Sequence, residues 1–299
     1  MNKTDFFPGL VGQARAKEIL NRGIESGKLA QTLIFVGRRG VGKKMAALLL
    51  ANALHSRGNA SAIGNANQAG KADTFVFSEI LAEMREQKKE NPFMEAARSI
   101  IKFLEMSPLS SEMKVAIIDN ADMLTAGSQN SLLKTLEEPR LNAVLILVTE
   151  DEDRLLPTIV SRSRIINFAP LTNDEIKKVV PDVSPEILEL ADGSIGFAKQ
   201  MAESIDARLE LNQIRDFWLS IKDADIETKI SWANDKRDRQ DAIKFLEIGL
   251  VAIRNQWLAN PTIIGARVIW LIQRTIYQIR ENVNARAALE AMLLAPVFN

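Results

Sequence analysis

The residues with the clearest capacity for chemistry form a glycine-rich turn, GRRGVGKK, at residues 37–44. The turn directly follows the apolar run 33–36 and precedes an apolar helical pattern. Between a strand and a helix, such glycines let backbone N–H groups face phosphate oxygens, and the ammonium of Lys43 can reach the outer phosphates. The segment therefore predicts a nucleotide-binding loop.

Position 44 departs from this motif, which has Ser or Thr there so that a hydroxyl can ligate magnesium. Lys44 carries three N–H donors and no acceptor, so it cannot ligate a cation while it is charged. Two interpretations stay open: a solvated lysine on the first helical turn, or the loss of the metal site.

A second pair of polar residues, Asp119 and Asn120, follows the apolar run 115–118. Ligands of parallel sheets gather at the carboxyl ends of the strands, where Asp119 can organise magnesium directly or through water. Asn120 cannot accept a proton at neutral pH, although it can orient a water molecule. We therefore predict weak or absent nucleotide hydrolysis at this site.

Unbroken apolar runs separated by helical patterns predict the element order of the first 170 residues. Unbroken apolarity is typical of strands that are covered on both faces, and the alternation with helices favours an α/β fold with a parallel sheet. The predicted strands are 33–36, 75–77, 115–118, 144–148 and 165–168, and the clearest helical patterns are 43–54, 92–106 and 127–137.

The remainder of the chain reads as helical. Thr172 and Glu175 can form a capping box, and all four tryptophans lie in the final third, which favours a separate helical domain with its own core. We place domain boundaries near residues 169 and 206. The Gly-, Asn-, Ala- and Ser-rich segment 56–71 predicts a surface loop or a disordered segment.

Composition excludes several classes of site. The 299 residues contain no cysteine and a single histidine, His55, which argues against disulfides, a thiol nucleophile, a zinc site and a Ser-His-Asp triad. Lys+Arg 38 balances Asp+Glu 38, which does not favour a free-standing nucleic-acid-binding module. Without a signal peptide or an apolar run of membrane-spanning length, the chain is expected to be cytoplasmic and to have no membrane partner.

Three further segments carry a family resemblance. KVAIIDNADML at 114–124, SQNSLLKTLEEPR at 128–140 and TIVSRSR at 158–164 closely resemble the clamp loader of bacterial DNA polymerase III, an AAA+ assembly. The likeness extends from LVGQ at 10–13 to NVNARAALE at 282–290. It implies an AAA+ P-loop domain at 1–168, a small helical lid at 169–206 and an all-α collar domain for oligomerisation at 207–299.

The resemblance also implies roles for individual residues. Arg162 corresponds to an arginine finger that acts in trans on the ATP of a neighbouring subunit, and Phe197 stands at or near the place of the sensor 2 arginine. The resemblance places Gly12 and Gln13 near the adenine and Thr149 at the sensor 1 position. Together with the loop and strand-end residues described above, the degenerate cofactor-binding set is Gly12, Gln13, Gly37, Gly40, Gly42, Lys43, Lys44, Asp119, Asn120 and Thr149. Many relatives carry four zinc-binding cysteines within 56–71, where this chain has none, so we expect no zinc or other metal.

Three departures from the family pattern, at Lys44, Asn120 and Phe197, each argue against ATP hydrolysis by this chain. We expect a subunit that has lost its own ATPase activity, serves as the stator of the clamp loader and contributes Arg162 to a neighbour. Its expected partners are the gamma/tau and delta subunits and, through the complex, the sliding clamp and primer-template DNA. We expect that this subunit requires no cofactor, although weak binding of ATP or ADP stays open. The alternative to a stator is an active clamp-loader ATPase of the gamma/tau motor type. Any polymerase activity would belong to the holoenzyme.

Overall fold

The computed structural model describes residues 5–56, 71–236, 238–281 and 283–298, which form two compact units. The N-terminal unit comprises Met1–Pro181 and Asp192–Phe197, and the C-terminal unit comprises Asp182–Ala191 and Ala198–Asn299. The predicted division into three domains stays a prediction. The loop predicted at 56–71 lies outside the described residues except at its two ends.

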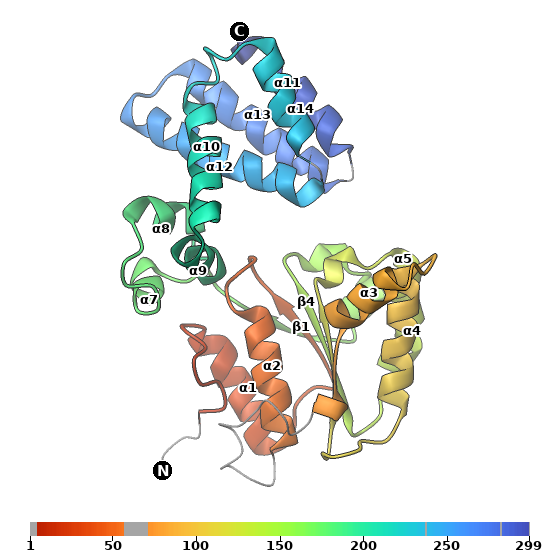
Figure 1. The fold of residues 1–299 in the computed structure, drawn as a ribbon. Helices are drawn as coiled ribbons and strands as arrows, with labels where there is room; N and C mark the ends of the chain where they lie inside the picture. Colours follow the sequence, from red (N-terminus) through yellow and green to blue (C-terminus); the bar gives the residue numbers. More distant parts are fainter. Residues whose placement is uncertain (1–4, 57–70, 237, 282, 299) are drawn as a thin grey trace. The chain divides into compact units, whose positions relative to one another are not determined.

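A five-stranded parallel sheet forms the centre of the N-terminal unit, in the order β2-β3-β4-β1-β5 (Figure 1). The strands are β1 (Thr32–Val36), β2 (Thr74–Val76), β3 (Lys114–Asp119), β4 (Ala143–Thr149) and β5 (Arg164–Asn167). All five strands that the apolar runs predict are present. At β2 the strand begins one residue earlier than predicted, at Thr74, and Phe77 begins the following helix instead of ending the strand.

Two helical layers enclose the sheet because its strands are apolar on both faces. Helices α1 (Ala14–Ser26) and α2 (Lys43–His55) cover one face, and α3 (Phe77–Glu86), α4 (Pro92–Glu105) and α5 (Ala126–Glu137) cover the other (Figure 1). Side chains alternate along β1: Leu33 and Phe35 join the first core, and Ile34 joins the second.

Short elements complete the N-terminal unit. Helix α6 (Pro157–Val160) precedes β5, and α7 (Asn173–Lys177) follows it. The predicted capping box is present: Thr172 Oγ1 accepts from the N–H of Glu175, and the Glu175 carboxylate accepts from the N–H of Thr172. Single 3-10 turns occur at Lys71–Asp73, Ala121–Met123 and Glu152–Arg154, and at Pro296–Phe298 in the C-terminal unit.

The regular elements in the described part of the C-terminal unit are all helices. Its helices are α8 (Pro185–Ala191), α9 (Ile195–Glu203), α10 (Ile205–Leu219), α11 (Ile226–Asp235), α12 (Arg239–Ala259), α13 (Ile263–Arg280) and α14 (Ala285–Leu293), with the first three residues of α9 assigned to the N-terminal unit. Its core is aromatic: Trp218 is fully buried, and the ring of Trp232 stacks on Phe245 with centroids 5.5 Å apart. Within the described ranges, no helix combines the length and apolarity needed to cross a bilayer.

Candidate functional site

The glycine-rich loop has a backbone that requires glycine. Gly37 and Gly40 have φ angles of 153° and 77°, and a Cβ on Gly37 would lie 2.3 Å from the carbonyl oxygen of Phe168. These positions are therefore set by a left-handed backbone and by the close approach of the chain that leaves β5. The loop leads from the carboxyl end of β1 into the N-terminus of α2, as the sequence predicts.

Residues 192–197 pack directly against this loop. The N–H of Gly196 donates to the carbonyl of Gly40 (3.0 Å), and a Cβ on Gly40 would lie 2.0 Å from Ser194 Oγ. Arg38 forms an ion pair with Asp192. Phe197, which the resemblance puts at or near the place of the sensor 2 arginine, donates its backbone N–H to Ser194 Oγ, and its phenyl ring carries no charge for a phosphate.

The ammonium of Lys43 binds backbone carbonyls of the glycine-rich loop itself. It donates to the backbone carbonyls of Gly37 and Arg38, the latter at 2.6 Å, and the side chain is buried. Burial lowers the pKa of Lys43 to about 8, against the opposing influence of the Glu150 and Asp122 carboxylates. The lysine that the motif assigns to phosphate is thus engaged by carbonyl oxygens.

Lys44 and Asp119 are joined across the candidate metal site. The Lys44 ammonium lies 2.6 Å from Asp119 Oδ2 and 3.1 Å from Ser78 Oγ, while the N–H of Ser78 donates to Asp119 Oδ1 (2.9 Å). Burial raises the pKa of Asp119, but the contacts with Lys44 and Ser78 outweigh it and hold the pKa below its usual value. Each carboxylate oxygen of Asp119 therefore has a donor from within the chain.

These residues do not fit a magnesium ion. A metal site at this position needs oxygen acceptors, yet an ammonium stands where the motif has a hydroxyl and is bonded to Asp119, the only carboxylate of the predicted cofactor-binding set. Asn120 has a left-handed backbone, with φ 61°, and an exposed side chain. Among the described residues no group of three or more His, Cys, Asp or Glu side chains could hold a metal ion.

The residues expected near the adenine and at sensor 1 have structural contacts. The Gln13 side-chain amide donates to the carbonyl of Ala169 (2.7 Å), and its Oε1 accepts from the N–H of Ala169 (3.0 Å). A Cβ on Gly12 would lie 2.5 Å from the side chain of Leu171. Thr149, at the end of β4, is buried and donates its hydroxyl to the carbonyl of Asp151 (2.8 Å). Gln13 and Gly12 thus contact the segment that follows β5, next to the glycine-rich loop.

Arg162 lies at the opposite end of the sheet from the glycine-rich loop. It precedes β5 by two residues, and Arg164 pairs in register with Leu33, near the start of β1. Four residue steps of about 3.3 Å separate Leu33 from Gly37, so the strand alone sets these ends roughly 13 Å apart. The Arg162 side chain is 37% exposed, and its guanidinium contacts Glu137 and the carbonyl of Thr158. It does not belong to the loop site of its own chain.

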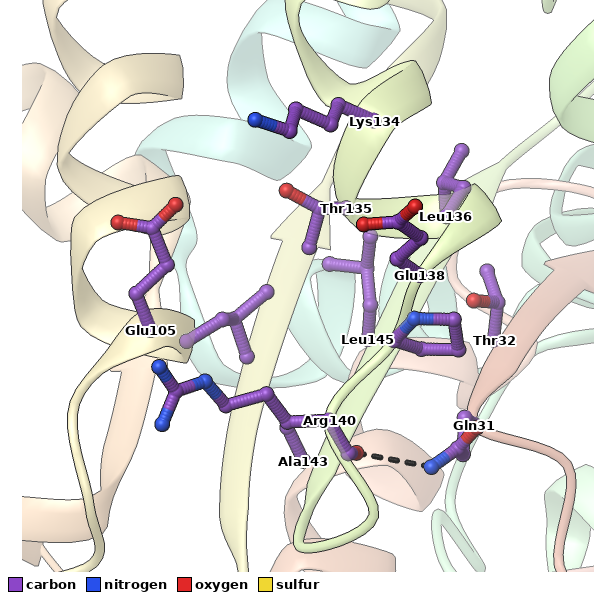
Figure 2. Close-up of a pocket in the computed structure, with 12 residues that line it drawn as sticks. Gln31, Thr32, Glu105, Lys134, Thr135, Leu136, Glu138, Arg140, Ala143 and Leu145 are labelled. Carbon is purple, nitrogen blue, oxygen red and sulfur yellow. Dashed lines mark hydrogen bonds between the residues drawn. The ribbon is translucent and has the colours of Figure 1, made fainter.

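A pocket of about 180 Å³ also lies at the amino end of the sheet, between the end of α5 and the starts of β1 and β4 (Figure 2). Gln31 donates to the carbonyl of Arg140 across its rim (2.8 Å), and both acidic and basic side chains line it. The pocket is therefore separate from the glycine-rich loop.

Sequence reasoning missed two contributors to these arrangements. Ser78, in the first turn of α3, bonds both Lys44 and Asp119, and Glu137 pairs with Arg162. Glu137 lies in the SQNSLLKTLEEPR segment, but its partner Arg162 is 25 residues away in sequence, where no local pattern connects the two. Ser78 lies just after β2, which pairs with β3. The strand order therefore places Ser78 near Asp119, at the end of β3.

Together, a parallel β2-β3-β4-β1-β5 sheet, a phosphate-loop turn after β1 and a helical C-terminal part define the AAA+ class of P-loop proteins. The sequence profile of the family described as "DNA polymerase III, delta subunit" matches residues 12–172, more than half of the chain. The chain belongs to this family, and the predicted kinship with DNA polymerase III clamp-loader subunits is confirmed.

Individual relatives agree with this assignment. The chain is 32% identical over 182 residues to DNA polymerase III subunit delta' of Bacillus subtilis, covering 60% of this chain and 54% of the relative. It is 29% identical over 176 residues to subunit gamma of Buchnera aphidicola, covering 59% and 48%. The chain thus spans about half the length of these curated relatives.

A solved structure shows the same fold. The crystal structure of a DNA polymerase III gamma subunit-related protein from Thermotoga maritima aligns with a TM-score of 0.54 and 17% identity, over 92% of this chain and 96% of that one. At this identity the likeness concerns the fold alone.

Proposed function

We propose that this chain is the delta' subunit, or stator, of the DNA polymerase III clamp loader, and that it has no ATPase activity of its own. The observation that carries the proposal is the ion pair between Lys44 and Asp119. It places an ammonium where catalysis by this motif needs a magnesium ion. Asn120 adds to the loss, because it cannot take a proton from an attacking water molecule.

The position of Arg162 supports a role in trans. Its guanidinium is exposed at the end of the sheet opposite the glycine-rich loop, where another subunit can approach it. The planar, permanently charged group and its five donors suit contact with a γ-phosphate and with the charge that develops during transfer. In this proposal the neighbour holds the ATP, and this chain supplies the arginine finger.

A ring partner for the C-terminal unit is supported by an exposed stripe on α13. Ile263, Trp270 and Tyr277 are all exposed and follow one another at seven-residue spacing, which returns to the same face of a helix. Large apolar residues repeated on one exposed face favour contact with another protein. We assign this stripe to the collar contact with the gamma/tau or delta subunits, in the assembly that loads the sliding clamp on primer-template DNA in the cytoplasm.

Two measurements test the function. The purified chain with ATP and magnesium is expected to show no turnover; turnover that Lys43→Ala abolishes would instead establish an active motor-type ATPase. In the reconstituted complex, Arg162→Ala is expected to lower DNA-stimulated hydrolysis and clamp loading, because an arginine finger contributes about 10³-fold or more at its site. Arg140→Ala, which removes another exposed arginine from the amino end of the sheet, is the matched control, and equal rates for the two variants would contradict the role in trans.

A further inference from the structure

Glu137 holds the guanidinium of Arg162 in a defined orientation. Arg162 Nη2 lies 3.0 Å from Glu137 Oε1, and Arg162 Nη1 donates to the carbonyl of Thr158 (3.0 Å) and, at 3.5 Å, to Ser161 Oγ. These contacts reach the guanidinium from the end of α5 and from α6 with the residue that follows it. A guanidinium has five N–H donors, so donors remain for a phosphate.

The location of Glu137 is unfavourable for the helix that carries it. Glu137 is the last residue of α5, where the partial negative charge of the helix C-terminus disfavours a carboxylate. The positive charge of Arg162 offsets this disadvantage. The carboxylate is therefore explained by its contact with Arg162 and not by the stability of α5.

We propose that Glu137 is a positioning residue for Arg162: it presents the guanidinium in a single orientation to the ATP of the neighbouring subunit. This inference rests on the proposed role of Arg162 in trans. A free arginine side chain samples many rotamers. A supporting carboxylate reduces the side-chain entropy that is lost when the guanidinium binds a phosphate. The carboxylate acts through Arg162 and does not touch the nucleotide.

The adjacent Glu138 provides a matched control. Glu138 lines the pocket between α5 and the strand starts, beside Leu136 (Figure 2), whereas Glu137 reaches Arg162. The two residues have the same charge, are both exposed and are separated by one peptide bond. Substituting each in turn therefore separates the contact with Arg162 from a general effect of charge at this surface.

The experiment uses the assembled complex with saturating primed DNA and sliding clamp. Glu137→Ala is expected to lower kcat for ATP by about fivefold and to leave KM unchanged, because a misplaced catalytic group slows the chemical step more than binding. Glu137→Gln keeps an acceptor oxygen in place and should recover part of this loss. Glu138→Ala should match the unaltered complex. Thermal unfolding of each isolated chain checks that it is folded, and the isosteric Gln variant preserves the test if the Ala variant does not fold.

A double variant separates positioning from a merely structural role. If Glu137 acts through Arg162, the pair Glu137→Ala and Arg162→Ala will be no slower than Arg162→Ala alone. An additional loss in the double variant, or a Glu137→Ala rate equal to that of Glu138→Ala while Arg162→Ala is slow, would overturn the positioning role and leave the proposed function standing. A full rate for Arg162→Ala would overturn both.

Discussion

The ammonium of Lys44 lies 2.6 Å from the carboxylate of Asp119, so the first turn of α2 is tied to the end of β3 by a charge that belongs to the chain itself. In P-loop proteins that hydrolyse nucleotide, the corresponding hydroxyl and carboxylate are organised around magnesium. The contact therefore contributes to the stability of the fold at a place where other members of the class perform catalysis.

Removing this ammonium is expected to destabilise the N-terminal unit. Lys44→Met leaves the Asp119 carboxylate, only 5% exposed, with the Ser78 amide but without its cation. We expect the free energy of unfolding to fall by about 1–2 kcal/mol at pH 7. The Lys44 side chain is 47% exposed, so solvent screening keeps the loss below that of a fully buried pair. Urea unfolding followed by circular dichroism measures it.

The pH dependence of this loss gives a further check. The pKa of Asp119 is lowered in the folded chain, so its contribution to stability is present above the unfolded pKa of about 3.9 and disappears as the pH falls through the folded value. The difference between Lys44→Met and the unaltered chain should therefore shrink below about pH 4. Lys102→Met, on the exposed side of α4, is the control. Identical unfolding of the two variants would show that the ion pair contributes nothing.

Lys43 should titrate near pH 8. Because its pKa is lowered to about 8 by burial, the unfolded chain binds more protons than the folded chain between about pH 8 and 10. This residue should therefore make the free energy of unfolding rise with pH across that window, and Lys43→Met should remove the rise. NMR of the Nζ group measures the midpoint directly. A midpoint near 10.5 would contradict the burial of the ammonium.

The same titration reports on the loop. A polyphosphate beside Lys43 would favour the charged form and raise its pKa. Since the ammonium is engaged by the carbonyls of Gly37 and Arg38, we expect ATP with magnesium to leave the midpoint near 8. An upward shift with ATP would instead show that nucleotide enters the loop.

Acid sensitivity should be traceable to Asp73. Its carboxylate is fully buried and accepts hydrogen bonds from the backbone N–H groups of Leu109, Ser110 and Ser111 and from the two serine hydroxyls. Burial alone would raise the pKa of Asp73, but these bonds hold it well below the usual value. Its contribution to stability is thus present above about pH 4 and is lost as the pH falls further.

Two variants test the Asp73 site. Asp73→Asn leaves the buried Lys114 ammonium, 3.5 Å away, without its counter-charge, and should cost about 3–5 kcal/mol at pH 7. It should also flatten the acid limb of the stability profile. Asp174→Asn, an exposed aspartate in α7, should leave both unchanged. An unaltered acid limb in Asp73→Asn would assign the acid sensitivity to other carboxylates.

The sequence was sufficient for the sheet because its strands are covered on both faces. The runs 115–118 and 144–148 are short, unbroken and rich in Val and Ile, which favours strands buried on both faces, and they form β3 and β4. The charged interior was not predictable in this way. Lys114 and Asp73 are residue types that are almost always exposed, and no local pattern marks them as a buried pair.

The site was predictable in its parts and not in its connections. The glycine-rich loop and Asp119 are identified by local spacing, but the bond from Lys44 to Asp119 joins residues 75 positions apart and depends on the strand order. Gln13 shows the same limit: its expected place near the adenine stays a prediction, and nothing in the sequence indicates that its amide bonds Ala169, 156 residues away. Side-chain partners of this kind require the folded backbone.

Gly249 gives the final prediction, in which the usual preference for alanine in a helix is reversed. Gly249 lies in the interior of α12, where Gly→Ala ordinarily stabilises by about 0.5–1 kcal/mol. Here a Cβ would lie 2.1 Å from Cε2 of Trp218. That ring is fully buried and is fixed by a hydrogen bond from Nε1 to the carbonyl of Phe245 (3.0 Å), so it cannot move aside. We expect Gly249→Ala to lower the free energy of unfolding by about 1–3 kcal/mol.

Comparison with a second glycine and a second variant isolates this clash. At Gly127 in α5 an added Cβ would lie 3.1 Å from the flexible end of Met94 and 3.9 Å from Thr125 Oγ1, an ordinary contact, so Gly127→Ala should be neutral or stabilising in urea unfolding. Trp218→Phe should be less costly when combined with Gly249→Ala than in the otherwise unaltered chain, because the smaller ring leaves room for the methyl group. If Gly249→Ala stabilises the chain as Gly127→Ala does, the result would contradict the close contact between Trp218 of α10 and Gly249 of α12.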